Sequence, residues 1–403
     1  MARKRRRGTT PSLPPEICAQ ICEELSRKDL VTLCRTSRLF GDQAQRIIYR
    51  VVDLRWSTPG ALLSWCLAVT RHPQLAQRVH SLFMHLPVDL SFSSDVAKIA
   101  RALAKCLNLK ELSIHRDNSD PFGFHYDCSI QGWIVTKCRF RLTKFSTSYF
   151  RIPFLSQFWT PQSEQLRVLS LPHCTEKFPI FEDQLPHLIA LEVGNTRALP
   201  ADRELQRIQL HGGTSLPELS GLGAYAASLA TFNLLRGNVK PDISTLQILD
   251  ALAQWVPDIL HLALIETDAW TTEQNLFSEG CPIGALAKFT RLETLSLYSQ
   301  RITAFDDPAL TEPYQLNDPV CLQAFGEAML KMCPTLRRVV VGARTDTPTG
   351  HHEWSPRPGV DAAVRRELVC TLTHTGAGAA GGETEVQFGT RFDFDAVSMF
   401  WKD

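Results

Sequence analysis

Residues 166–210 hold three copies of one apolar pattern: LRVLSL (166–171), LIALEV (188–193) and LQRIQL (205–210). Each copy carries an aliphatic residue at its first, fourth and sixth positions. The fourth and sixth positions are two residues apart, and side chains two residues apart point to the same face of a β-strand. The stretch therefore predicts short strands that return at intervals along the chain.

The same pattern recurs, with conservative apolar replacements, on both sides of this stretch. Ten copies span residues 79–341 with a mean spacing of about 29 residues, near the upper end of the range for strand–helix repeats. One or two copies could arise by chance in any leucine-rich α/β protein, but ten in order favour a repeat architecture. The weakest copy is LTKFST, with Thr147 at its last apolar position. The copies are VHSLFM from Val79, LKELSI from Leu109, LTKFST from Leu142, LRVLSL from Leu166, LIALEV from Leu188, LQRIQL from Leu205, LATFNL from Leu229, ILHLAL from Ile259, LETLSL from Leu292 and LRRVVV from Leu336.

Helical patterns lie between the copies, most clearly over residues 93–108 and 319–333. A single strand and helix cannot bury their apolar sides alone, so neighbouring units must stack. The sequence therefore predicts an α/β fold in which residues 56–345 form an irregular solenoid, a parallel β-sheet with outer helices.

The stretch before the repeats, LPPEICAQICEELSRKDLVTLCRTSRLF (13–40), predicts a small helical bundle. Two prolines at 14–15 favour a helix start, and apolar residues follow at helical spacing. Ser26 or Asp29 can cap a second helix, and a third is expected over about 40–49. So small a bundle has too little interior for all these side chains. Some must face a partner, unless they pack against the rest of the chain.

This stretch resembles the F-box, a helical module that joins a protein to the Skp-type adaptor of a cullin–RING ubiquitin ligase. The resemblance rests on LPPE (13–16), the apolar spacing that follows, Asp29-Leu30 and the YRVVDLR segment (49–55). Phe40 stands where the family usually carries Trp, and Thr36-Ser37 replace the commoner Val-Cys. The combination of this F-box over 13–55 with the repeats resembles the leucine-rich-repeat class of F-box proteins.

The resemblance implies a non-catalytic substrate-recognition subunit of a Skp–cullin–F-box ubiquitin ligase. The F-box would dock the adaptor and, through it, the cullin, while the solenoid would bind an unknown protein substrate. The alternative is a leucine-rich-repeat binding scaffold that acts outside a ligase. The residues that the family pattern assigns to the adaptor contact are Leu13, Pro14, Ile17, Ile21, Leu25, Leu30, Leu33 and Phe40.

A substrate surface is predicted from the seventh position of each repeat, because alternation along the strand sends this position away from the core. Three consecutive repeats carry large apolar residues there, Leu235, Ile265 and Tyr298. We expect them to form one exposed stripe, because exposed apolar patches tend to mark binding surfaces. The alternative is that residues 350–403 fold back and cover the stripe.

The charge pattern separates a basic tail (1–12) from the rest. The formal net charge is +1, but RKRRR (3–7) supplies five of the 43 basic residues, leaving 38 against 42 acidic ones. The remainder has no overall basic footprint for nucleic acid. Residues 3–7 could serve as a nuclear import signal or stay a solvated tail. No apolar run suits a membrane span or a secretory signal, so a cytoplasmic or nuclear location is expected.

Sequence motifs for chemistry are lacking: there is no GxSxG, GxxxxGK[ST] or HExxH, so no catalytic residue, metal ligand or cofactor is predicted. The twelve cysteines are expected to be free thiols, and Cys18 and Cys22 lack a second ligand pair for zinc. A tail over 346–403 is expected to hold a short helix at 361–369 and a strand-like run at 384–394. Between them, Gly376–Gly381 fits GxGxxG formally but is interpreted as a hinge.

Overall fold

The computed structural model describes residues 13–86, 94–116, 131–176, 184–201, 203–212, 215–236, 243, 245–266, 283–299, 318–344, 367–375, 383–394 and 398–402. The chain divides into two compact units. The first comprises residues 1–118 and 126–165, and the second comprises 119–125 and 166–403. The basic tail and the glycine run at 376–381 lie outside the described residues, and the predicted domain borders stay predictions.

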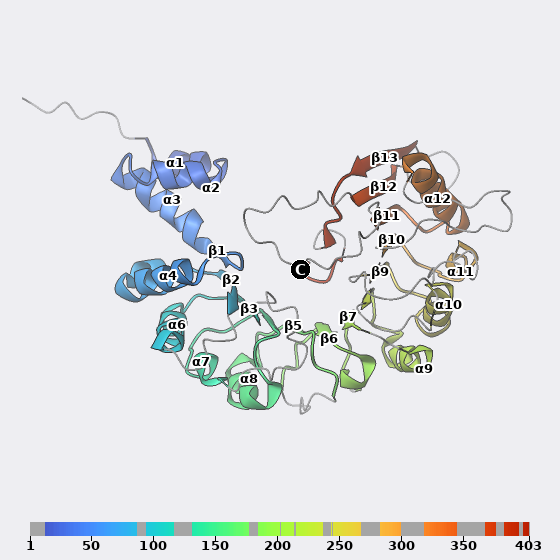
Figure 1. Cartoon of the computed structure of the whole chain (residues 1–403), viewed down its shortest axis with the longest axis horizontal. Coiled ribbons are helices and arrows are strands. Elements are labelled where there is room, and N and C mark those ends of the chain that lie inside the picture. Colours follow the sequence, from blue (N-terminus) through green and yellow to red (C-terminus); the bar gives the residue numbers. More distant parts are fainter. Residues whose placement is uncertain are drawn as a thin grey trace, which may run out of the picture. The chain divides into compact units, whose positions relative to one another are not determined.

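The first unit opens with the three expected helices, α1 (Pro15–Glu23), α2 (Arg27–Leu33) and α3 (Arg38–Arg50), seen in blue in Figure 1. A serine precedes each of the last two. The Ser26 hydroxyl accepts from the Asp29 amide, and the Ser37 hydroxyl accepts from the Phe40 amide, so both helices begin with a satisfied donor. Ser26, rather than Asp29, is therefore the cap of α2.

Four parallel strands follow in the first unit, in sequence order: β1 (Val51–Leu54), β2 (Ser81–Leu86), β3 (Glu111–Arg116) and β4 (Lys144–Thr147). β1 was not among the predicted repeats. It lies in the segment interpreted as the end of the F-box, yet it pairs with β2 along its whole length. The helices between these strands are α4 (Pro59–Arg71), α5 (Pro73–Ala76), α6 (Ser94–Lys105) and α7 (Trp133–Thr136), and β4 is followed by η2 (Ile152–Leu155) and α8 (Ser156–Gln162).

The weakest repeat is completed by polar contacts instead of an aliphatic side chain. Thr147 is buried, and its hydroxyl accepts from the amides of Tyr149 and Phe150 as the chain turns after β4. At the end of α8, the side chain of Gln162 is fully buried. It accepts from the Leu142 amide and donates to the Phe140 carbonyl. Both side chains satisfy backbone groups that burial would otherwise leave unpaired.

In the second unit seven strands are parallel and in sequence order: β5 (Val168–Leu171), β6 (Ala190–Val193), β7 (Arg207–His211), β8 (Thr231–Arg236), β9 (His261–Glu266), β10 (Thr294–Ser299) and β11 (Arg338–Arg344). The helices between them are η3 (Thr196–Ala198), α9 (Leu216–Leu219), η4 (Ser220–Tyr225), α10 (Thr245–Trp255), α11 (Ile283–Leu286) and α12 (Pro319–Met332). Each predicted copy of the pattern thus contains a strand, and the strand begins at the third residue of the copy. The α/β class and the parallel sheet with helices are confirmed.

Two antiparallel strands close the second unit, β12 (Glu367–Thr375) against β11 and β13 (Glu383–Gly389) against β12. The helix predicted over 361–369 is wrong for 367–369, which open β12; residues 361–366 lie outside the described part. Pairing with β11 satisfies backbone groups along that strand, and this tertiary gain overrides local helix propensity. The strand-like run predicted over 384–394 ends at Gly389.

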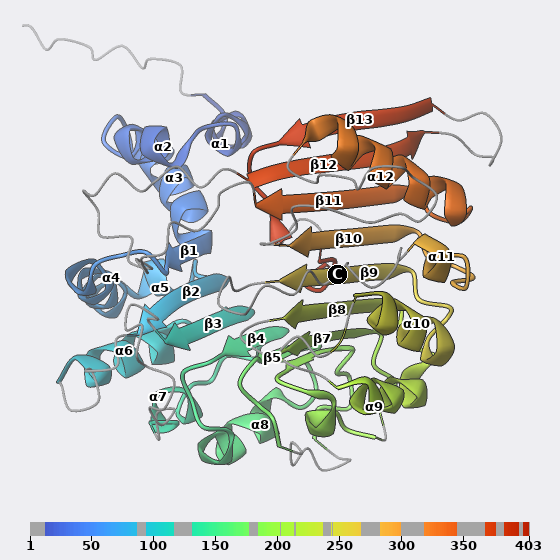
Figure 2. The same ribbon diagram turned by 45° about the vertical axis from the view of Figure 1, so that its right-hand side comes forward.

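Within each unit the helices cover one face of the sheet (Figures 1 and 2). We call this the outer face and the opposite one the inner face. The fourth and sixth residues of the repeats, such as Leu112 and Ile114 of β3, point to the outer face and are fully buried. The third, fifth and seventh residues lie on the inner face, as the alternation predicts.

Candidate functional site

The helical domain exposes one apolar stripe. Leu13, Ile17 and Ile21 are 47%, 41% and 39% exposed, although each is a large aliphatic side chain. They are four residues apart on and just before α1, so they fall on one face of the helix. Pro14, the residue before α1, is also exposed. These four of the predicted adaptor contacts therefore form a single accessible surface.

The other four predicted contacts lie in or against the core of the helical domain. Leu30 is 3% exposed and packs with Cys22 and Ala44. The predicted contacts that are half-buried against this cluster are Leu25, Leu33 and Phe40. Leu30 thus has a structural position, because its side chain is already enclosed by its own domain, and we leave it out of the proposed contact surface.

One exposed aliphatic residue in this domain was not predicted, Val31, which is 49% exposed on α2. It directly follows the buried Leu30, so the two side chains point in different directions from the helix. The apolar spacing of α2 assigns its stripe to Leu30 and Leu33 and gives no reason to include the residue between them. Val31 is thus a further exposed apolar position of this domain, on α2.

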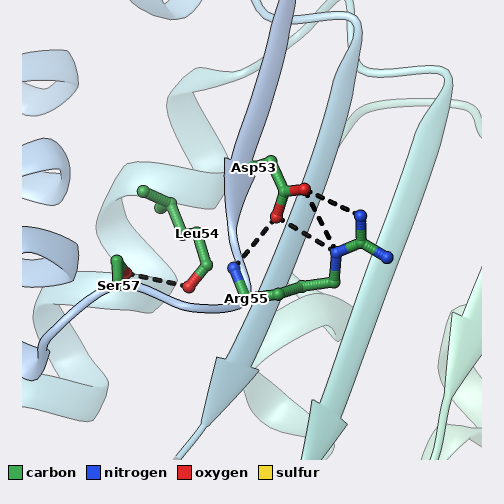
Figure 3. Close-up of polar contacts among 4 residues, drawn as sticks. All are labelled: Asp53, Leu54, Arg55 and Ser57. Carbon is green, nitrogen blue, oxygen red and sulfur yellow. Dashed lines mark hydrogen bonds and ion pairs between the residues drawn. The ribbon is translucent and has the colours of Figure 1, made fainter. Parts of the chain in front are cut away.

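On the inner face of the first unit, an ion pair closes the end of β1. The Arg55 guanidinium turns back onto Asp53 and donates from Nε and Nη2, at 2.7–3.2 Å, while the Arg55 amide also donates to Asp53 (Figure 3). The hydrogen bonds from Arg55 hold the pKa of Asp53 below its ordinary value. Arg55 also lies 5.2 Å from the centre of the Phe83 ring. The two charges are thereby largely neutralised within the chain.

Beside this pair a row of rings crosses the inner face of the first unit. Trp56 is 83% exposed, and its ring lies edge-on to His85 at 5.5 Å between centroids. His85 lies edge-on to His115 at 6.2 Å. His115 is held by two hydroxyls, Ser146 at 2.8 Å from Nε2 and Ser148 at 3.0 Å from Nδ1. This row is polar and aromatic, and Trp56 is open for contact.

On the inner face of the second unit, the predicted substrate stripe is formed but covered. Leu235, Ile265 and Tyr298 occupy paired positions of β8, β9 and β10, as expected from their common place in the repeat. They are only 6%, 5% and 7% exposed, because Phe392 and Phe394 pack against them. The expected exposure of the stripe is therefore wrong, and the alternative of a covering tail describes this structure. Its role in substrate binding stays a prediction.

A buried polar ladder lies beside the stripe, on the same face. The Glu192 carboxylate of β6 accepts from the side chains of Gln209 and His211 of β7. The side-chain oxygen of Gln209 in turn accepts from the Asn233 amide group of β8. Burial raises the pKa of Glu192, but the hydrogen bonds from His211, Ser170 and Gln209 and the charge of His211 outweigh it, so its pKa lies below the ordinary value. Glu192 is therefore a charged and fully hydrogen-bonded member of this ladder.

The described cysteines are free thiols in apolar surroundings. Burial raises the pKa of Cys66, Cys106 and Cys138 to about 12, which keeps these thiols protonated and unreactive. Among the described residues, no group of three or more His, Cys, Asp or Glu side chains is placed to hold a metal ion. None of the described helices is both long and apolar enough to cross a membrane.

The comparison with protein families gives one match. Residues 10–55 match the family model described as F-box-like, and this range contains α1–α3 and β1. The chain thus carries an F-box-like domain, followed by strands and helices consistent with a leucine-rich-repeat solenoid. Among curated proteins, none matches the chain.

Proposed function

We propose that this protein is a non-catalytic substrate-recognition subunit of a Skp–cullin–F-box ubiquitin ligase. F-box domains bind Skp-type adaptors, and the F-box-like domain here leaves Leu13, Ile17 and Ile21 exposed as one stripe. This stripe is the observation that carries the proposal, because an aliphatic helix face without a cover within its own domain is suited to burial against a partner. Pro14, next to Leu13 in the chain, extends the surface.

On this proposal the protein performs no chemistry and works by proximity. The F-box-like domain holds the adaptor and through it the cullin, while the sheet holds the substrate near a ubiquitin-loaded enzyme. Bringing the target lysine and that enzyme together raises their effective concentration.

We propose that the substrate binds on the inner face of the sheet in the second unit. The support is the apolar and aromatic cluster on that face, which contains Leu235, Ile265 and Tyr298. Aromatic side chains supply large contact areas at low entropic cost, which is why they are frequent in binding surfaces. We further propose that residues 3–7 act in nuclear import.

The proposal is tested by titrating a purified Skp-type adaptor into the full chain and into an Ile17→Ala/Ile21→Ala double variant. Both side chains are already exposed, so the helical domain should stay folded. Loss of two buried contacts at about 2 kcal/mol each should weaken adaptor binding by about 100-fold or more. Val320→Ala is the matched control, because Val320 is an aliphatic residue of α12 that is 73% exposed.

Calorimetric titration supplies the affinities, and far-UV circular dichroism checks the fold of each variant. Binding by the control should equal that of the wild type. Adaptor binding that stays within about threefold in the folded double variant would remove the α1 stripe as the docking surface. The scaffold alternative is favoured instead if the adaptor binds normally and the assembled complex never takes up a cullin.

A further inference from the structure

One segment of the chain occupies the inner face of the second unit. Residues 390–394 and 398–402 follow β13 and lie against strands of the sheet, in place of a layer of helices. Phe392 and Phe394 pack on Leu235, Ala263, Ile265 and Tyr298, and the rings of Phe392 and Tyr298 lie 4.6 Å apart at 33°. We call these residues the inner-face segment.

A second pair of aromatic residues in the segment reaches the opposite side of the same face. Phe400 is fully buried against Val168 of β5 and Ala190 of β6, and Trp401 packs beside it. The inner face therefore holds two separate aromatic anchor sites, one on β8–β12 and one on β5–β6. Asp393, which lies between Phe392 and Phe394, is exposed. The first site thus accepts an aromatic–x–aromatic sequence and does not enclose its middle residue.

The polar contacts across this face hold the backbone of the segment. Asn233, at the end of the buried ladder, donates to the Ser398 carbonyl at 2.9 Å. Glu367 of β12 accepts from the Phe392 amide at 2.8 Å and from the Tyr298 hydroxyl at 3.1 Å. Because any polypeptide offers the same carbonyl and amide groups, these contacts would serve another extended chain with suitable aromatic residues equally well.

The segment leaves hydrogen-bonding capacity of the sheet unused. Asn233 Oδ1, His261 Nδ1 and Ser296 Oγ, on β8, β9 and β10, are buried without a partner among the described residues. Buried polar atoms without partners cost free energy. Met399, between the contacts of Ser398 and Phe400, has a φ of 54°, a conformation that L side chains rarely adopt. The segment is therefore well anchored by its rings but imperfectly fitted between them.

We propose that the inner face of the second unit is a peptide-binding site, held in cis by the inner-face segment. Its partner in trans is an extended protein segment with an aromatic–x–aromatic sequence and a further aromatic residue for the β5–β6 site. This inference rests on the proposed function in one respect, which is that it identifies this partner as the ligase substrate. The bound partner satisfies the Asn233, His261 and Ser296 atoms that the cis segment leaves unpaired.

The test measures binding of a fluorescein-labelled peptide with the sequence of residues 389–402 to the full chain. The wild type and a Phe392→Ser/Phe394→Ser variant are compared by fluorescence anisotropy. A ligand can bind only those molecules in which the cis segment has left the site. Its apparent affinity is therefore its intrinsic affinity multiplied by the fraction of such open molecules. The variant should therefore bind the peptide at least tenfold more tightly than the wild type.

Two controls isolate the site. Phe388→Ser removes a phenylalanine of β13 that is 49% exposed and lies outside the anchor clusters, so this variant should bind the peptide as the wild type does. A peptide with serine in place of both Phe392 and Phe394 keeps only the residues for the β5–β6 site. It should bind the double variant more weakly than the unchanged peptide does. Peptide binding that is equal in the wild type and the double variant, with the sheet intact by circular dichroism, overturns the proposal.

Hydrogen exchange of the wild type covers the case in which the double variant fails to fold. Opening of the cis segment alone should let the Phe392 and Ser398 amides exchange at least 100-fold faster than those of β9. Exchange at the same rate as β9 would make the segment a fixed part of the core and overturn the proposal. Adaptor binding through α1 is measured separately, so failure of the peptide site leaves the proposed function standing, and the converse holds as well.

Discussion

At the scale of single residues, Gly342 explains how the aromatic contact on the inner face is made. A Cβ atom at this position would lie 2.6 Å from Cδ2 of Tyr298 and 3.2 Å from Cδ2 of Phe392. Gly342 pairs with Tyr298 on the neighbouring strand, so the missing side chain leaves the room that both rings fill. A glycine in the middle of a strand ordinarily weakens it, and here the space it provides compensates.

We therefore expect Gly342→Ala to destabilise the second unit. Overpacking of a filled site costs about 1–3 kcal/mol, which corresponds to a fall in the melting temperature of about 2–10 °C for a unit of this size. Gly284→Ala in α11 is the control, since nothing lies within 4 Å of its added Cβ. Differential scanning calorimetry compares the two variants. An unchanged melting temperature for Gly342→Ala would contradict the described packing of Tyr298 and Phe392.

His261 gives the inner face a pH dependence with a definite sign. Burial lowers the pKa of His261, the charge of Glu293 opposes this, and the charge of Lys402 adds to it, so the net pKa lies below the ordinary 6.5. The unfolded chain then binds a proton at this residue before the folded one does. Stability contributed by neutral His261 is complete above pH 6.5 and is lost as the pH falls from 6.5 through the lower folded pKa.

The prediction is that His261→Gln flattens the fall in melting temperature between pH 7 and pH 5, because glutamine does not titrate. His72→Gln, which replaces an exposed residue before α5, should keep the wild-type slope. Thermal unfolding at half-unit steps of pH provides the comparison. If His261→Gln follows the wild-type curve throughout this range, His261 is not the group that couples protonation to folding.

At the scale of elements, the local pattern of the sequence was sufficient for the repeats. All ten strands begin where the LxxLxL spacing places them, and the helices over 94–105 and 319–332 lie inside the predicted ranges. These elements are specified by side chains close in sequence, whose period reports which face is buried. Strand β1 was not predicted because VVDL carries no complete copy of the pattern.

Features that depend on distant partners were predicted less well. Residues 367–369 became part of β12 because β11 offers an edge for pairing, which local propensity does not register. The cover over Leu235, Ile265 and Tyr298 comes from aromatic residues more than 90 positions later in the chain. Alternation placed these three residues on the correct face and in the correct register. Their exposure depended on which segment returns to that face, and alternation carries no information about that.

Only part of the predicted adaptor surface is exposed, because burial again depends on packing that the sequence pattern does not report. The family pattern assigned Leu13, Ile17 and Ile21 to the adaptor contact, and the structure leaves all three exposed. The same pattern included Leu30, which the three helices enclose, and left out Val31, which points outward. In a bundle this small, each apolar residue has one of two roles, and the packing of all three helices decides which.

At the scale of the whole molecule, the two surfaces that we propose for binding do not share residues. The F-box-like domain at 10–55 presents an aliphatic stripe, and the repeats build a sheet whose inner face carries aromatic and polar side chains. Across the described part of the chain, no metal-binding group accompanies them. On the proposed function, the protein acts by what it brings together, so its partners define its role.

Co-purification with both ligase components tests the proposed ligase role most directly. The full chain and the Ile17→Ala/Ile21→Ala variant are each expressed with a Skp-type adaptor and a cullin, and the isolated complexes are weighed by native mass spectrometry. We expect one chain, one adaptor and one cullin for the wild type, and the variant chain alone. A wild-type chain that binds the adaptor but never the cullin, or neither of them, would contradict the proposed role.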